Sequence, residues 1–289
     1  MKRPNTTPDV PGAPFFKGWA RPGPIPPGAM QQPWGECGPD ETLDAISGHF
    51  RIYQLRKGHR FSTDDVLTAW YGTSWCPTAA TVLDLGGGIG SVGMIAAWRL
   101  PGARFVAVEA QEESVRLARK SLRYNGLEAR YEIRTGDFRD PALLAGGEKF
   151  DLILGSPPYF PTGTGIGGDH PQKIACRFEL RGDIADYCNV AAVHLASGGW
   201  FACVFPTGQM ERVQSAARSV GLAIVRQRAV VLREEEAPLL TLFAMMRADH
   251  LPPPVRERTW LEPALVIRSR DGHVHPEYAA VKLSFGFPP

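Results

Sequence analysis

The sequence lacks the features that mark several large protein classes. It has no run of about 18 apolar residues, so we expect no membrane-spanning helix. Its first residues carry no apolar stretch of the signal-peptide type, and we expect a cytoplasmic protein. The five cysteines form no Cys-x-x-Cys pair and have no histidines near them in a ligand pattern, so we expect reduced thiols and no bound metal.

A strong excess of one charge is also missing. The 32 basic and 30 acidic residues leave a net charge of +2, which by itself does not require a nucleic-acid partner. One short window is locally basic, from Arg51 through Arg56, Lys57 and His59 to Arg60. We consider Lys57 and Arg60 as candidates for binding substrate phosphate, and a solvated hairpin edge as an equal alternative.

Proline and glycine are distributed unevenly along the chain. Ten of the 26 prolines fall within the first forty residues, interleaved with glycine and aromatic residues. This composition predicts a leader over residues 1–41 that is disordered or loosely packed, and the alternative is an arm whose aromatic rings pack on the domain or contact substrate. Residues 42–289 are long enough for a single domain with one core, which begins with a hairpin over 42–60.

A stiff loop follows the apolar run 150–154. It reads Gly-Ser-Pro-Pro-Tyr-Phe over residues 155–160, and each proline fixes its own φ and extends the residue before it. The Ser156 oxygen and the Pro157 carbonyl are then held as acceptors for both N–H groups of an exocyclic amine, and Tyr159 can stack on the ring that bears it. With Pro158 these residues are the candidate catalytic group. A plain Pro-Pro turn that ends a strand is the alternative.

A strand, a glycine-rich turn and a helix occur in that order upstream of this loop. The strand at 81–83 ends at Asp84, and a helical run begins at Ser91. Three glycines lie between them: Gly86, Gly88 and Gly90. Glycines let backbone N–H groups and the helix N-terminus approach a nucleotide-type cofactor closely. A tight turn without a ligand and an NAD site are the alternatives, although NAD binding gives no reason for the proline loop.

Acidic residues also end the next two predicted strands. The strand at 103–108 is followed by Glu109, which can accept hydrogen bonds from ribose hydroxyls. The strand around 131–134 leads to Asp137 and Phe138, a carboxylate and a ring that can hold an adenine base. The alternatives are an ordinary surface glutamate for Glu109 and a helix N-cap for Asp137.

Together these signals resemble the class I S-adenosylmethionine-dependent methyltransferases, in particular the amino-methylating group with an Asn/Asp/Ser-Pro-Pro-Tyr/Phe loop after the fourth strand. The resemblance implies an α/β fold: a doubly wound, mostly parallel, seven-stranded Rossmann-like sheet with an antiparallel edge hairpin. It also implies S-adenosyl-L-methionine as cofactor. The implied cofactor-binding residues are Thr63, Asp84, Gly86, Gly88, Gly90, Glu109, Asp137 and Phe138.

Further elements narrow the resemblance to the bacterial tRNA1(Val) adenine-N6 methyltransferases. These are the segment 54–65, the Arg177-x-Glu179 pair and the tail at 265–268 and 276–278. The implied substrate is the N6 amine of an adenine in a tRNA anticodon loop, where bases can leave the stack. Phe160, Arg177 and Glu179 join Lys57 and Arg60 as substrate-binding candidates, although Arg177 and Glu179 are equally interpreted as a structural ion pair.

One residue departs from that family, which usually has asparagine in place of Ser156. A serine hydroxyl is a shorter acceptor than an amide carbonyl, so the amine must sit closer or a water must bridge. Ser-Pro-Pro-Tyr is familiar from cytosine-N4 DNA methyltransferases. Three alternatives therefore stay open: a cytosine-N4 methyltransferase, a protein glutamine methyltransferase of the release-factor type, and a non-catalytic RNA module that binds the cofactor.

Overall fold

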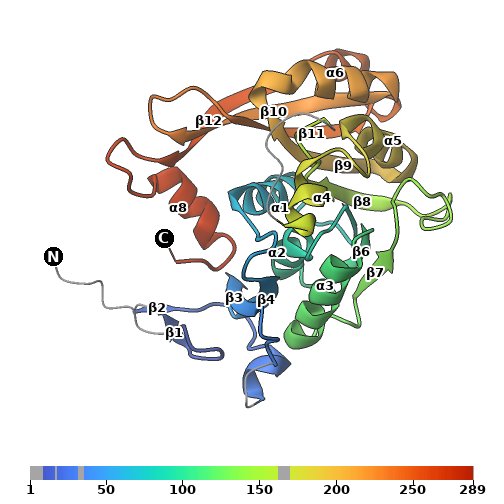
Figure 1. Ribbon diagram of the computed structural model, residues 1–289. Helices are drawn as coiled ribbons and strands as arrows, with labels where there is room; N and C mark the ends of the chain where they lie inside the picture. The colour runs from blue at the N-terminus through green and yellow to red at the C-terminus, as the bar shows by residue number, and fades with distance from the viewer. Residues whose placement is uncertain (1–8, 17, 32–35, 162–169, 289) are drawn as a thin grey trace.

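The computed structural model describes residues 9–16, 18–31, 36–161 and 170–288, and within them the backbone but not the side chains of Lys173, Ala175 and Arg177. An eight-stranded sheet forms the centre of the molecule, in the order β12-β10-β11-β9-β8-β5-β6-β7 (Figure 1). Its strands are β5 (Thr81–Leu85), β6 (Arg104–Glu109), β7 (Tyr131–Thr135), β8 (Phe150–Gly155), β9 (Leu195–Pro206), β10 (Leu222–Arg233), β11 (Leu240–Arg247) and β12 (Trp260–Arg268).

The strand directions confirm the predicted doubly wound sheet. Strands β7, β6, β5, β8 and β9 are parallel, and β10 and β11 form the expected antiparallel hairpin next to β9. The eighth strand, β12, was not predicted and pairs parallel with β10 at the sheet edge. Residues of β5 and β8 such as Leu83 and Ile153 are fully buried, as expected for parallel strands covered on both faces.

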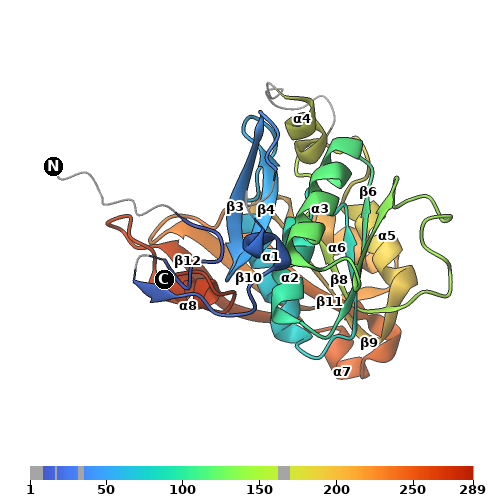
Figure 2. The same ribbon diagram turned by 90° about the horizontal axis from the view of Figure 1, so that it is seen from below.

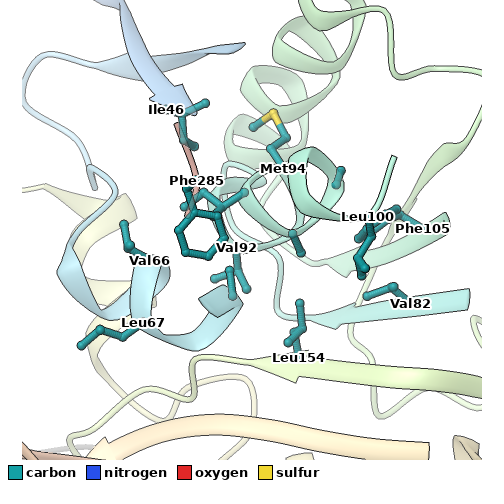
Figure 3. Packing of buried hydrophobic residues seen from close by; sticks show 14 of the residues in the cluster. Ile46, Val66, Leu67, Val82, Val92, Met94, Leu100, Phe105, Leu154 and Phe285 are labelled. Atoms are coloured by element: carbon teal, nitrogen blue, oxygen red, sulfur yellow. The ribbon is translucent and has the colours of Figure 1, made fainter. Parts of the chain in front are cut away.

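Two sets of helices cover the two faces of the sheet. Side chains of α1 (Thr63–Trp75), α2 (Ser91–Arg99) and α3 (Glu112–Asn125) belong to one apolar cluster, and those of α5 (Ile184–His194) and α6 (Met210–Ser219) belong to the other. Short elements complete the fold: η1 (Pro27–Met30), α4 (Pro171–Arg177), η2 (Thr207–Gln209), η3 (Ala248–His250), α7 (Pro253–Arg256) and α8 (Pro276–Leu283). Figure 3 shows Phe285, which follows α8, among Ile46, Val66 and Val92 of the first cluster.

The predicted N-terminal hairpin consists of β3 (Glu41–Ser47) and β4 (Phe50–Leu55) and lies beside α3 (Figure 2). Backbone N–H groups on the free edge of β4 donate hydrogen bonds to side chains of α3 instead of to another strand. The Arg51 N–H donates to Asn125 Oδ1 at 2.9 Å, and the Tyr53 N–H donates to Ser121 Oγ at 2.9 Å. The hairpin is thereby fixed to the domain through its backbone.

The described part of the leader contacts the domain at several points. Strands β1 (Phe15–Phe16) and β2 (Trp19–Ala20) form a small antiparallel pair, and Asp9 forms ion pairs with Arg21 and Arg51. Gly28 lies so close to the Tyr124 ring that a Cβ there would be 2.3 Å from it. Composition favours loose packing for this segment, but Asp9 is fixed to the hairpin through Arg51, and η1 with Gly28 packs on α3.

None of the helices in the described residues is long and apolar enough to cross a membrane. All five cysteines are free thiols, and Cys188 and Cys203 are buried in the core.

Candidate active site

The glycine turn lies between β5 and α2 and depends on backbone conformations that favour glycine. Gly86, Gly88 and Gly90 have φ values of +62°, +55° and +85°. A Cβ at Gly86 would lie 2.3 Å from the Tyr187 hydroxyl, whereas a Cβ at Gly88 would meet no atom within 4 Å. Packing therefore explains glycine at position 86. At position 88 the backbone is open to the adjoining space.

That space is a cavity of about 680 Å³ at the carboxyl ends of β5, β6 and β8. Its volume falls in the range of about 300–1,000 Å³ that is common for small-molecule sites. It brings together most of the predicted site residues, in its lining: Arg60, Asp84, Gly86, Gly88, Glu109, Asp137, Phe138, Ser156, Pro157, Pro158, Tyr159 and Phe160. Residues about 100 positions apart in the chain thus share one site, as expected where parallel strands end together.

Three carboxylates beneath the cavity are almost fully buried. Asp84 accepts the Gly93 N–H at 3.0 Å, and Glu109 accepts the N–H groups of Gly88 and Gln111 at 2.8 and 2.6 Å. Burial raises the pKa of Asp84 to about 7 and also raises the pKa of Glu109.

Asp65 is the third buried acid, and burial raises its pKa to about 7 as well. It accepts the Ser62 N–H at 2.9 Å in the capping box of α1. Among the described side chains, no lysine or arginine forms an ion pair with any of these three acids. The floor of the cavity is therefore acidic, and the charge of Arg181, which lines the cavity, only partly opposes the effect of burial on the pKa of Glu109.

Asp137 and Phe138 line the adjoining part of the cavity. Hydrogen bonds from Arg139, one of them 2.9 Å from Arg139 Nε to Asp137 Oδ1, lower the pKa of Asp137. Phe138 packs edge-on against Tyr187, with ring centroids 4.7 Å apart. The Asp137 carboxylate is thus ionised, and the Phe138 ring is held in place.

The proline loop forms the remaining wall. The Tyr159 hydroxyl donates to Asp64 Oδ2 at 2.7 Å, and its ring packs edge-on against Phe205 at 5.7 Å. Ser156 is half-buried in the lining. Phe160 is 44% exposed and leans on Phe178 with centroids 6.0 Å apart. The loop therefore presents a hydroxyl and an accessible ring to the cavity.

This chain is similar to several known methyltransferases. Residues 72–173 match the family model of the methyltransferase small domain. The tRNA1(Val) (adenine(37)-N6)-methyltransferase of Porphyromonas gingivalis is 26% identical over 82% of this chain and 92% of its own length. The corresponding enzyme of Shewanella sp. strain MR-4 is 27% identical over 78% and 90%.

The chain is also similar to an enzyme that methylates a protein and to a solved structure. The release factor glutamine methyltransferase of Geobacter sulfurreducens is 33% identical over 47% of this chain and 49% of its own length. A solved structure, a predicted O-methyltransferase from Agrobacterium tumefaciens, has a TM-score of 0.59 at 18% identity and covers 78% of this chain and 98% of its own, which supports the fold alone.

This chain is an S-adenosylmethionine-dependent methyltransferase with the class I fold. Its cofactor is S-adenosyl-L-methionine, and the cavity fits that molecule. The backbone at Gly88 is open, so a ligand can approach its N–H, and the buried acids supply acceptors for hydroxyl and ammonium groups. The resemblance to the tRNA1(Val) adenine-N6 enzymes that the motifs indicated is confirmed.

Some predicted site residues of the methyltransferase lie outside the cavity lining. Thr63 is the first residue of α1 and hydrogen-bonds Tyr278, although its neighbours Ser62 and Asp64 do line the cavity. Gly90 lies behind the turn, where a Cβ would meet Met94 at 3.1 Å.

Some of the substrate-binding candidates also lie outside the cavity lining. Lys57 lies outside the lining, and Arg60, inside it, pairs with Asp44 at 2.8 Å. Glu179 is paired with Arg212 at 2.6 Å. The side chain of Arg177 lies outside the described residues, so its expected pairing with Glu179 stays a prediction.

Sequence reasoning missed several lining residues: Arg56, His59, Asp65, Gln111, Cys176, Phe178, Arg181 and Tyr187. Arg56 and His59 lie in the locally basic window that supplied Lys57 and Arg60, and Asp65 also had a usable signal, since Ser62-x-x-Asp65 is a capping-box pattern. Tyr187 reaches the site from the buried face of α5, and nothing local distinguishes it from a core residue.

Proposed function

We propose that the methyltransferase acts on the exocyclic amine of a nucleobase, and that this base is an adenine, methylated at N6 in the anticodon loop of a tRNA. The observation that carries the proposal is the Ser-Pro-Pro-Tyr loop, which lines the cofactor cavity beside the glycine turn. Relatives that span about four fifths of the chain bear the name of that reaction. Both observations support an amine as the methyl acceptor.

On this proposal, the acids and glycines hold the cofactor. Glu109 accepts hydrogen bonds from the ribose hydroxyls, and Asp137 and Phe138 hold the adenine of the cofactor. Asp84 and the turn of Gly86, Gly88 and Gly90 hold its methionine end. Thr63 contributes by fixing the first turn of α1 above the site. The bound cofactor supplies an activated methyl group on a sulfonium centre.

The proline loop orients the acceptor amine. The Ser156 hydroxyl and the Pro157 carbonyl each accept one N–H of the amine, which keeps the nitrogen lone pair out of the ring and directs it at the methyl group. Tyr159 and Pro158 border the base, and the exposed ring of Phe160 offers a stacking surface at the entrance. Positioning and electrostatics supply most of the rate, and no strong general base is required.

Cations at the cavity entrance support a polyanionic substrate. Arg56, Lys57 and Arg181 are exposed, and none of them forms an ion pair among the described residues, although the charge of Arg181 lowers the pKa of Glu109 and of Asp137. Arg60 lies beside them, and Glu179 anchors the segment after α4. Unpaired arginines and lysines around a base-sized pocket suit phosphates that flank an extruded nucleotide.

A protein glutamine methyltransferase is the second candidate, because the 33% identity to the release-factor enzyme covers 145 residues. A glutamine side chain also presents an NH₂ group to the loop. The unpaired cations at the entrance favour the nucleic acid over this candidate.

The test is the effect of Ser156→Ala on transfer of labelled methyl groups to tRNA that lacks the modification. We expect a fall in kcat of about 100-fold, since one positioning acceptor is lost, with cofactor Kd unchanged within about twofold. Ser156→Asn, which restores an acceptor, should recover activity, and Ser215→Ala on the exposed face of α6 is the control. Unchanged kcat, or equal loss of kcat and cofactor affinity, would contradict the role of Ser156.

A further inference from the structure

Tyr159 is the one residue of the proline loop that is hydrogen-bonded at both of its ends among the described contacts. Its hydroxyl donates to Asp64 Oδ2 at 2.7 Å. Its carbonyl accepts from Gln209 Nε2 at 3.0 Å. The two partners come from different parts of the chain, Asp64 from the first turn of α1 and Gln209 from η2. The loop is therefore attached to two separate elements.

The Gln209 attachment is itself supported by a chain of contacts. Arg212 donates to Gln209 Oε1 at 2.7 Å and to Glu179 Oε1 at 2.6 Å. The Arg212 guanidinium lies over the Phe205 ring at 5.6 Å, and Tyr159 packs on that same ring. Because the side-chain oxygen of Gln209 is occupied by Arg212, its NH₂ group is left to face the Tyr159 carbonyl. The orientation of this amide is thus determined by its neighbours.

The Asp64 attachment lies on the cofactor side. Asp64 lines the cavity, and its neighbours Ser62 and Asp65 belong to the capping box that begins α1. A change in the angle of the loop would break the bond to Asp64 or the bond to Gln209. The two attachments together therefore set the tilt of the loop relative to the cofactor.

We propose that Asp64 and Gln209 are positioning residues that act through Tyr159 and aim the Ser156 hydroxyl and the Pro157 carbonyl at the substrate amine. The inference rests on the proposed amine methylation. The prolines fix φ within the loop but leave its tilt as a rigid unit free, and a misplacement of about 1 Å can lower a rate about 100-fold. Arg212 and Glu179 support the Gln209 end.

The first test is a double-mutant cycle on methyl transfer to tRNA. Asp64→Ala and Tyr159→Phe should each lower kcat about tenfold or more with cofactor KM changed less than about threefold, and the double variant should be no slower than Tyr159→Phe alone, which also loses the side-chain hydrogen bond between Tyr159 and Ser156. Asp64→Asn keeps an acceptor and should restore kcat to within about threefold of wild type. Multiplicative effects in the double variant, or unchanged kcat in both single variants, would overturn the proposal.

The second test examines the Gln209 end. Gln209→Met removes the donor at nearly constant volume and should lower kcat about tenfold, again with little change in cofactor KM. Arg212→Lys, which keeps the charge but not the planar fork, should give an intermediate loss. A rate equal to wild type in Gln209→Met would remove Gln209 from the proposal.

A readout independent of activity separates this inference from the proposed function. Hydrogen exchange of the peptide that contains residues 155–160 should be faster in Asp64→Ala and Gln209→Met, while peptides from β5 and β6 exchange as in wild type. If wild type methylates no nucleobase but the exchange result holds, the attachment stands and the proposed function fails. Unchanged exchange in both variants would contradict the attachment whatever the substrate is.

Discussion

Glu41 in the hairpin and Asp84 beneath the cavity are buried to nearly the same degree, 4% and 1% exposed, yet their electrostatics are opposite. Glu41 pairs with Lys120 at 2.6 Å and with Arg116 at 2.7 Å, and its pKa is lowered to about 2 despite the opposing effect of burial. Asp84 has no described cation beside it, and burial raises its pKa to about 7.

On the proposed function, the difference separates a structural carboxylate, Glu41, from carboxylates that bind the cofactor. The bonds of Glu41 are satisfied within the protein, since the Gly38 N–H and two cations surround it. Asp84 and Glu109 accept backbone N–H groups, but neither forms an ion pair among the described residues, and the charge of Arg181 offsets only part of the effect of burial on the pKa of Glu109. A buried acid without a cation destabilises the fold, and it is retained where a bound molecule uses it.

The largest expected effect comes from Asp84→Asn. Cofactor affinity should fall about 100-fold, because an acceptor with a full charge is lost. The protein without cofactor should at the same time become more stable above pH 7, with a rise in Tm of about 3 °C, because a buried ionised carboxylate is removed. Calorimetric titration and thermal unfolding at pH 8 measure both. Loss of affinity together with loss of stability would mean that Asp84 is structural.

Glu41→Gln should have the opposite effects, a loss of stability with unchanged cofactor binding. We expect the free energy of unfolding to fall by about 2 kcal/mol, because Lys120 and Arg116 lose their shared acid, while cofactor affinity stays within about twofold of wild type. Urea unfolding measures the first and titration the second. Glu128→Gln is the control, since its 3.5 Å pair with Arg123 is exposed on both sides and should contribute little. A Glu41→Gln variant as stable as that control would contradict the structural role.

The pH dependence of stability should reflect both the acids with a raised pKa and the acid with a lowered pKa. The pKa values of Asp65 and Asp84 are raised from 3.8 to about 7, so their contribution is complete below about pH 4 and is lost as the pH rises to about 7. The pKa of Glu41 is lowered from 4.5 to about 2, so its contribution is present above about pH 4.5 and is lost as the pH falls to about 2. In the Asp84→Asn variant, the free energy of unfolding should therefore decrease less between pH 4 and pH 7 than in wild type. An unchanged slope there would contradict the raised pKa.

The smallest expected effect is on tRNA binding and comes from removing single cationic side chains near the cavity. Lys57→Ala and Arg181→Ala should each weaken tRNA binding about threefold and reduce the salt dependence of log K by about one, because each removes one phosphate contact. Arg104→Ala, exposed at the opposite end of the parallel strands, should leave both unchanged. Binding titrations at several salt concentrations decide the point, and equal slopes for all three variants would remove these residues from the interface.

Local patterns were sufficient to predict the glycine turn and the proline loop that line the cavity. The turn after Asp84 and the loop around Ser156 follow from glycine and proline, whose backbone preferences need no tertiary context. Strand β12 was missed because its partner β10 is distant in sequence and Pro263 argues against a strand, although an edge strand tolerates it. The close packing of Gly28 on Tyr124 depends on contacts that no local pattern encodes.

The most direct measurement is the identity of the methylated nucleoside after the enzyme acts on total tRNA that lacks the modification, with labelled cofactor, digestion and mass analysis. N6-methyladenosine as the labelled product is the predicted result. Label in cytidine would place the enzyme with the cytosine-N4 type that Ser156 also fits. No label in any nucleoside, with cofactor bound and release factor methylated instead, would contradict the nucleobase as substrate.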